Sequence, residues 1–181
     1  MTLLLTPAPT PLDCPRVAVH ADLQGNHLTL SYHINKKSPY DWAVFNPHNC
    51  QHADFLWEKD CLECFIGIDE HAYFEVNASP NGAFALYHFE SYRNPAHLPP
   101  KATKALDFQW KNIGLNQPED GWFVSEFCFQ IGLPSGFIPT TLNPTVILHP
   151  DGEPIFYAHT HANPPDFHDK AFWVDFSIHS L

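Results

Sequence analysis

The sequence has few basic residues and no long apolar run, and these two shortages argue against several classes of protein. Its 181 residues include 9 lysines and arginines against 20 aspartates and glutamates, which gives a formal net charge of −11 at pH 7. Nucleic acids and anionic membranes attract proteins through basic side chains, so neither is expected as a partner. No stretch approaches the roughly 20 apolar residues that a membrane-spanning helix needs.

The N-terminal segment and the cysteines also lack the features of a secreted protein. Residues 1–12, MTLLLTPAPTPL, contain a run of three leucines without a basic segment before it, so we expect a short edge segment or arm and no signal peptide. The five cysteines are Cys14, Cys50, Cys61, Cys64 and Cys128, an odd set that gives no disulfide framework. We therefore expect five free thiols and a cytoplasmic location.

Convincing helical patterns are missing as well. The chain has 18 prolines, which break helices, and 15 phenylalanines, which favour the pleated surface of a sheet. Its apolar content of 44% is enough for one hydrophobic core at this length. Short alternating segments separated by Gly, Pro and Asn turns predict an all-β fold. We expect a two-sheet antiparallel β-sandwich of the jelly-roll type, as a single domain over residues 1–181.

Alternation of apolar and polar residues predicts the individual elements and the core. The expected elements include hairpins over residues 17–34 and 145–159, a long central strand at 122–131, a short strand at 42–45, a turn at 117–121 and a closing strand at 172–178. The side chains expected to fill the shared core are Leu62, Cys64, Ile66, Phe74, Val76, Phe127 and Phe129.

Residues 55–93 hold three consecutive strand patterns and the densest set of candidate binding groups. Glu63 and Glu75 fall in neighbouring strands, close to Trp57 and Tyr73. A carboxylate within a strand must be solvated or paired, and carboxylates beside aromatic surface suit a polar ligand better than a core. This stretch therefore indicates a binding site for a polar molecule.

Three segments of the sequence together resemble a known family. They are residues 57–66 (WEKDCLECFI), residues 120–131 with Asp120-Gly121-Trp122, Glu126 and Ile131, and residues 165–172 with Pro165-Asp166-Phe167-His168-Asp169 and Phe172. In this order, with strand-length spacing, they are similar to segments of the family 9 carbohydrate-binding modules and their relatives in the DOMON-like superfamily, which are β-sandwiches. The resemblance covers about residues 55–178.

The resemblance implies a non-catalytic module that binds a carbohydrate or another polyol. It places Trp57 and Phe167 as an aromatic clamp on a sugar ring and Glu63 on a hydroxyl group. Further candidates for ligand binding are Glu75, Asn77, Arg93 and His168. The chain departs from the sugar-binding members of the family at two positions, since Glu75 stands where they have an arginine and Phe167 where they have a second tryptophan. Arg93 is a candidate for the missing cation.

No cofactor is expected, and metal binding rests on weak patterns. The family resemblance allows a structural calcium ion, whereas haem held by methionine and histidine is not expected because Met1 is the only methionine. Cys61-x-x-Cys64 has the spacing of a zinc or redox pair, but residues three apart in a strand point to opposite faces. The best group of candidate metal ligands is His159, His161, His168 and Asp169, and it stays open; His48-x-Cys50-x-His52 is weaker.

Two other functions stay open beside carbohydrate binding. Glu63 and Glu75 on adjacent strands are compatible with a glycoside-processing enzyme that uses a carboxylate pair. A protein-interaction β-sandwich with a lost sugar site would be favoured by a flat surface around Trp57. The sequence has no nucleophile elbow and no Gly-rich phosphate loop, so binding without catalysis is the main prediction.

Overall fold

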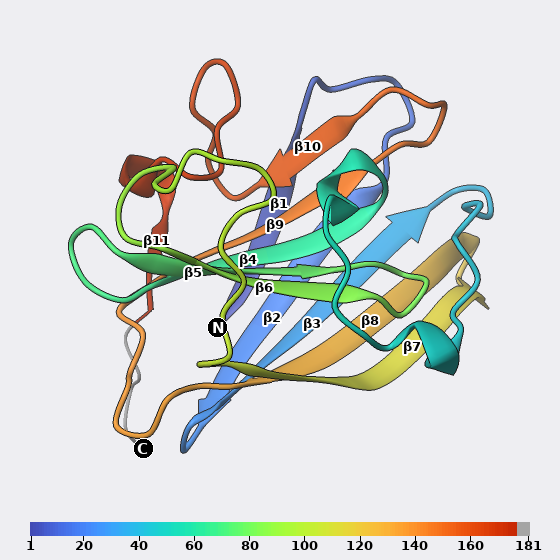
Figure 1. Cartoon of the computed structure of the whole chain (residues 1–181). Coiled ribbons are helices and arrows are strands. Elements are labelled where there is room, and N and C mark those ends of the chain that lie inside the picture. Colours follow the sequence, from blue (N-terminus) through green and yellow to red (C-terminus); the bar gives the residue numbers. More distant parts are fainter. Residues whose placement is uncertain (177–181) are drawn as a thin grey trace.

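The computed structural model describes residues 1–176 and consists of strands joined by turns and loops (Figure 1). The strands are β1 (Thr2–Ala8), β2 (Arg16–Gln24), β3 (His27–Lys36), β4 (Cys61–Gly67), β5 (Tyr73–Ala78), β6 (Phe84–Phe89), β7 (Asp107–Glu119), β8 (Trp122–Gly132), β9 (Thr141–Leu148), β10 (Ile155–Ala158) and β11 (Val174–Asp175). Three single turns of 3₁₀ helix are η1 (Pro47–Asn49), η2 (Leu56–Glu58) and η3 (Lys170–Phe172). No helix in this part of the chain is long and apolar enough to cross a membrane. Neighbouring strands pair antiparallel, so the predicted all-β antiparallel fold is confirmed.

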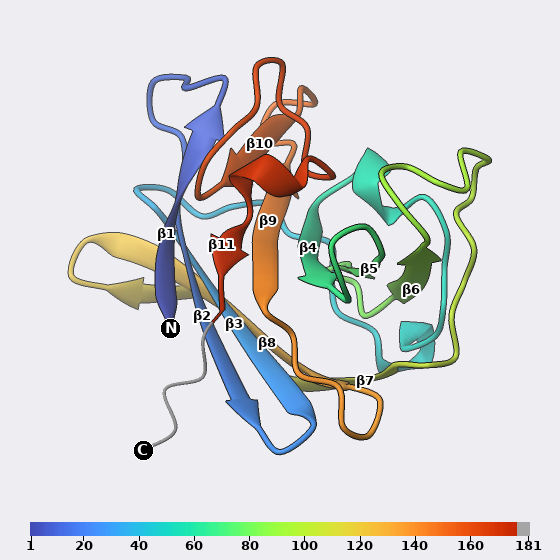
Figure 2. The ribbon, with the colours of Figure 1, turned by 90° about the vertical axis from the view of Figure 1, so that its left-hand side faces the viewer.

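The strands form one continuous curled sheet, where the sequence predicted two separate sheets. Their order is β6-β5-β4-β9-β10-β1-β2-β3-β8-β7, and β11 also pairs with β9. The two halves join at β1, because residues 2–5 pair with β2 and residues 6–8 pair with β10 (Figure 2). The prediction of an N-terminal edge segment or arm was therefore wrong. A short apolar run does not reveal that partners will pair with it on both sides.

The two ends of the sheet approach each other, which makes the sheet barrel-like and nearly closed. Phe84 of β6 stacks on Phe108 of β7 with 4.6 Å between the ring centroids. The indole N–H of Trp110 on β7 donates to the backbone oxygen of Gly82 at 2.8 Å. Strand twist accumulates over a sheet of this width and curls it toward closure. Side chains, and not a ladder of backbone hydrogen bonds, join β6 to β7.

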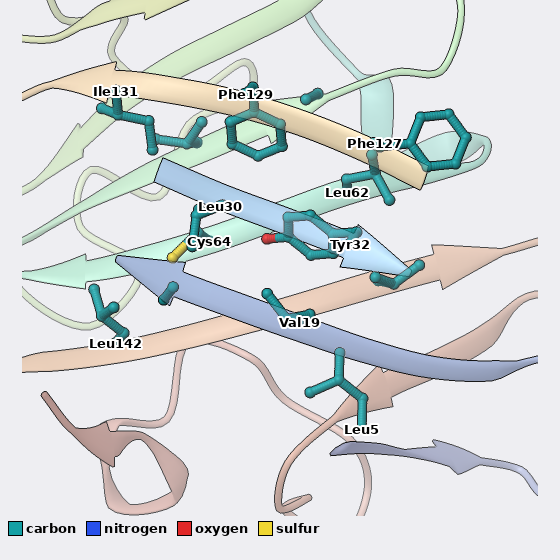
Figure 3. Close-up of a cluster of buried hydrophobic side chains, with 14 of the residues drawn as sticks. Leu5, Val19, Leu30, Tyr32, Leu62, Cys64, Phe127, Phe129, Ile131 and Leu142 are labelled. Atoms are coloured by element: carbon teal, nitrogen blue, oxygen red, sulfur yellow. The ribbon is translucent and has the colours of Figure 1, made fainter. Parts of the chain in front are cut away.

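The core lies between the two halves of the sheet (Figure 3). The seven side chains predicted for it are all buried there, which confirms that prediction: Leu62, Cys64, Ile66, Phe74, Val76, Phe127 and Phe129. Tyr32 of β3 reaches across the core and donates its hydroxyl to the backbone oxygen of Glu63 on β4. Because side chains alternate along a strand, the opposite faces of β4 and β5 are turned away from this core.

The hairpins and the long strand lie where the sequence predicted them, whereas one expected strand is absent and two boundaries differ. The structure has no strand at residues 42–45, where Trp42 is buried and donates its indole N–H to Ser125 Oγ at 2.8 Å. Strand β7 continues to Glu119, so the turn expected at residues 117–121 is confined to Asp120 and Gly121, both with positive φ. The closing strand expected at residues 172–178 is confined to β11, which pairs with β9, because Phe172 belongs to η3; residues 177–178 lie outside the described residues.

Candidate ligand-binding pocket

An aromatic cluster covers the face of β4, β5 and β6 that is turned away from the core. It consists of Phe65, Tyr73, Ala85, Tyr87 and Phe89, and Leu56, Trp57, Phe167 and Trp173 pack over it. We call this group the outer cluster. Exposure of an apolar sheet face to water is unfavourable. Burial of these side chains therefore holds η2 and the segment before η3 against the sheet.

The segments over the outer cluster enclose a pocket of about 390 Å³. Six of the seven predicted site residues line it: Trp57, Glu63, Glu75, Arg93, Phe167 and His168. The seventh, Asn77, is fully buried and hydrogen-bonded to Glu75. The structure thus brings together residues from η2, β4, β5, the loop after β6 and the segment before η3.

Glu63 lies at the floor of the pocket and is 2% exposed. Its Oε2 accepts a hydrogen bond from Thr145 Oγ1 at 3.1 Å, across the pair of strands β4 and β9. Burial raises the pKa of Glu63 to about 8, and the nearby charge of Glu75 contributes to the rise. This carboxyl is therefore largely protonated at neutral pH.

Glu75 lies on β5, the strand next to Glu63, and is 4% exposed. Its Oε1 accepts a hydrogen bond from Asn77 Nδ2 at 2.8 Å, which fixes the orientation of the carboxyl group. Its Oε2 is buried without a hydrogen-bond partner in residues 1–176. Burial raises the pKa of Glu75 to about 7. The floor therefore holds two acidic groups that titrate near neutral pH.

His168 lies beside Glu75 and is neutral. Its Nδ1 lies 2.7 Å from the hydroxyl of Tyr73, which itself accepts the backbone N–H of Arg93 at 3.2 Å. This contact links the ring of His168 to Tyr73 on β5, and the direction of the hydrogen bond depends on which ring nitrogen carries the proton. Nε2 is 3.9 Å from Glu75 Oε2, too far for a hydrogen bond. Burial, followed by the charge of Arg93, lowers the pKa of His168 to about 4.

Arg93 lies at the rim, on the loop after β6, with a left-handed φ of 49°. Its Nη2 donates to Asp166 Oδ1 at 2.9 Å, and Asp166 Oδ2 accepts the hydroxyl of Tyr92. This cation therefore lines the pocket, and its direct ion-pair partner is Asp166. The pair connects the loop after β6 to the segment before η3 and so forms one wall of the pocket.

Trp57 and Phe167, the predicted aromatic clamp, both line the pocket and both pack against the outer cluster. The ring of Trp57 meets Tyr87 with 6.1 Å between centroids, and that of Phe167 meets Phe65 at 6.4 Å. Each ring therefore has a packing role beside any role in binding. The surface at Trp57 is concave, unlike the flat surface that would favour a protein-interaction module.

Eleven further residues of the pocket lining were not predicted from the sequence. They are Phe65, Phe89, Pro95, Ala96, His97, Leu98, Pro100, Ile147, Phe156, Pro165 and Asp166. Phe65 could have been found, because it shares a strand face with Glu63. Residues 95–100 have no periodic pattern, so only the fold shows that their loop lies over the sheet.

The candidate metal ligands do not form a cluster. Within residues 1–176, no group of three or more His, Cys, Asp or Glu side chains is arranged to hold a metal ion. Nδ1 of His159 and Nε2 of His161 lie against the backbone oxygens of Leu4 and Thr6, at 3.2 Å and 2.7 Å. All five cysteines of the chain are free thiols in the structure.

Comparison with known proteins identifies a shared fold. No family model and no curated protein matches the chain. The structure is similar to the crystal structure of a putative carbohydrate-binding protein from Bacteroides uniformis ATCC 8492, with a TM-score of 0.56. The match covers 96% of this chain and 84% of that protein, with 16% sequence identity. At this identity the similarity concerns the fold alone.

Proposed function

We propose that the chain is a non-catalytic module of the DOMON-like, family 9 type that binds a carbohydrate or a similar polyol. The observation that carries this proposal is the convergence of Trp57 and Phe167 with two buried acids, Glu63 and Glu75, in one pocket. A pyranose has apolar ring faces, which stack on aromatic rings, and hydroxyl groups, which need fixed hydrogen-bonding partners. The fold shared with the Bacteroides protein agrees with this function.

The size of the pocket favours a single sugar or the end of a chain as the ligand. Its volume of about 390 Å³ is near the lower end of the roughly 300–1,000 Å³ that is typical of small-molecule sites. A long polysaccharide bound along its length would need an extended groove. We therefore expect monosaccharides and disaccharides to bind as tightly as longer oligosaccharides do.

Calorimetry with a panel of monosaccharides and disaccharides tests the proposal. Trp57→Ala is expected to weaken binding roughly ten- to a hundredfold, because lost stacking is worth about 1–3 kcal/mol. Trp122→Ala is the matched control, since Trp122 lies on β8, where it contacts Arg16 and Lys37. Unchanged binding in Trp57→Ala, or no binding of any saccharide to the wild type, would contradict the proposal.

A second candidate function is glycoside processing by the acidic pair. One observation favours it: Glu63 and Glu75 are buried on adjacent strands with raised pKa values, as a general acid requires. Product analysis on glycosides, alongside calorimetry, separates the two functions. An enzyme would lose turnover in Glu63→Gln while retaining its ligand, whereas a binding module would release no products in the wild type.

A further inference from the structure

The floor of the pocket carries two acidic groups, and in residues 1–176 no positively charged side chain is hydrogen-bonded to either of them. In the described part of the chain, the pocket is lined by three side chains that can carry a positive charge: Arg93, His97 and His168. Arg93 is paired with Asp166 at the rim, and His97 is exposed on the loop after β6. His168 is hydrogen-bonded to Tyr73, and its Nε2 is beyond hydrogen-bonding distance of the floor.

The unpaired oxygen at this floor belongs to Glu75, which lines the pocket while being 4% exposed. No donor in residues 1–176 reaches its Oε2. A buried acceptor without a donor is unfavourable, and so is ionisation of both acids on the adjacent strands. A ligand group that donates hydrogen bonds would remove the first cost, and a positive charge on that group would also offset the second.

An ammonium group meets these requirements better than a hydroxyl group does. It has three donors and no acceptor, so it can bond to Glu63 and Glu75 together without turning a lone pair toward either. A hydroxyl has a single hydrogen to donate. The aromatic rings of Trp57, Phe65 and Phe89 line the same pocket, and aromatic faces attract cations.

We propose that the pocket selects sugars or sugar-like polyols that carry a protonated primary amine, with the ammonium group held between Glu63 and Glu75. This inference rests on the proposed carbohydrate-binding function and names the class of sugar. Because a neighbouring ammonium stabilises the ionised carboxylate, binding should drive protons from the acidic pair into the solvent. A neutral sugar brings no positive charge and should therefore release fewer protons than the amine.

Calorimetry with matched ligands tests the inference. Glucosamine, galactosamine and mannosamine are each compared with the parent hexose and with the N-acetyl derivative at pH 6.5, in two buffers of different ionisation enthalpy. At least one amine is expected to bind about tenfold more tightly than its neutral counterparts, the scale of one charge-assisted hydrogen bond. Its binding should release more protons than that of the neutral sugars.

Two variants connect this preference to the floor of the pocket. Glu75→Gln is expected to abolish the preference for the amine. Glu119→Gln removes one carboxylate from the exposed end of β7, and this variant is expected to retain the preference for the amine. If Glu75→Gln fails to fold, the comparison of amine and neutral sugars on the wild type still decides whether the pocket selects the amine.

The possible outcomes separate this inference from the proposed function. A neutral sugar that binds as tightly as its amine overturns amine selection and leaves carbohydrate binding in place. No binding of any saccharide overturns both. Cyclohexylamine serves as a ring amine without hydroxyl groups. If it binds as tightly as the best hexosamine, the ammonium site is supported and its assignment to sugars is overturned.

Discussion

The buried acidic pair should make the folded protein less stable as the pH rises toward 8. Burial raises the pKa of Glu63 from its ordinary value of 4.5 to about 8 in the folded state. Between these values the unfolded chain binds fewer protons than the folded one, so the free energy of unfolding falls with rising pH. Glu75, with a folded pKa of about 7, acts in the same direction.

Glu63→Gln should remove the larger part of this dependence, because glutamine has nearly the shape of the protonated carboxyl and does not ionise. A shift of one unit in a pKa corresponds to about 1.4 kcal/mol. The shift in the pKa of Glu63 from 4.5 to about 8 therefore lowers the free energy of unfolding of the wild type by roughly 3–4 kcal/mol between pH 5 and pH 8. The variant should match the wild type at pH 5 and exceed it at pH 8.

Urea denaturation followed by tryptophan fluorescence at several pH values from 5 to 8 measures this difference. Glu119→Gln is the control, because it removes one carboxylate from an exposed position, and its pH profile should run parallel to that of the wild type. A Glu63→Gln profile that runs parallel to that of the wild type, or a variant that is less stable than the wild type at pH 8, would show that Glu63 does not hold its proton in the folded state.

Two other predictions concern the thiols and the first strand. Titration of the unfolded, non-reduced chain should find five thiols, and in the native protein Cys50, which is exposed, should react before the buried Cys61 and Cys64; three or fewer thiols would contradict this. Leu5→Ala should lower the free energy of unfolding by about 2–5 kcal/mol, because Leu5 is buried in the core at β1. Leu4→Ala, at a neighbouring position that is 72% exposed, should change it by no more than about 0.5 kcal/mol, and an equal loss in both variants would count against this role of β1.

The strands and the core were predictable because their signal is local. Alternation alone placed Leu62 and Cys64 in the core and Glu63 on the opposite face of β4. The short turn between β4 and β5 made these strands antiparallel neighbours, so the proximity of Glu63 and Glu75 also followed from the sequence. The burial of both acids did not, because it depends on the loops that cover the sheet.

The features that escaped prediction depend on contacts between distant residues. The wall of the pocket requires Arg93 to meet Asp166, 73 positions later in the chain. Phe167 and His168 were placed at the site through the family resemblance, since no periodic pattern surrounds them. The single continuous sheet depends on β1 pairing with β10, and the two segments carry no signal that they are partners.

The pairing of β1 with β10 also determines how the chain can fold during its synthesis. Thr6 pairs with Ala158, so one edge of β1 has no native partner until most of the chain has left the ribosome. Contacts between residues so far apart form slowly, and an unpaired strand edge can meanwhile recruit another chain. Pro7 lies on that unpaired edge and is opposite Tyr157 in the folded sheet. Because proline has no backbone N–H, it weakens the edge as a template for aggregation.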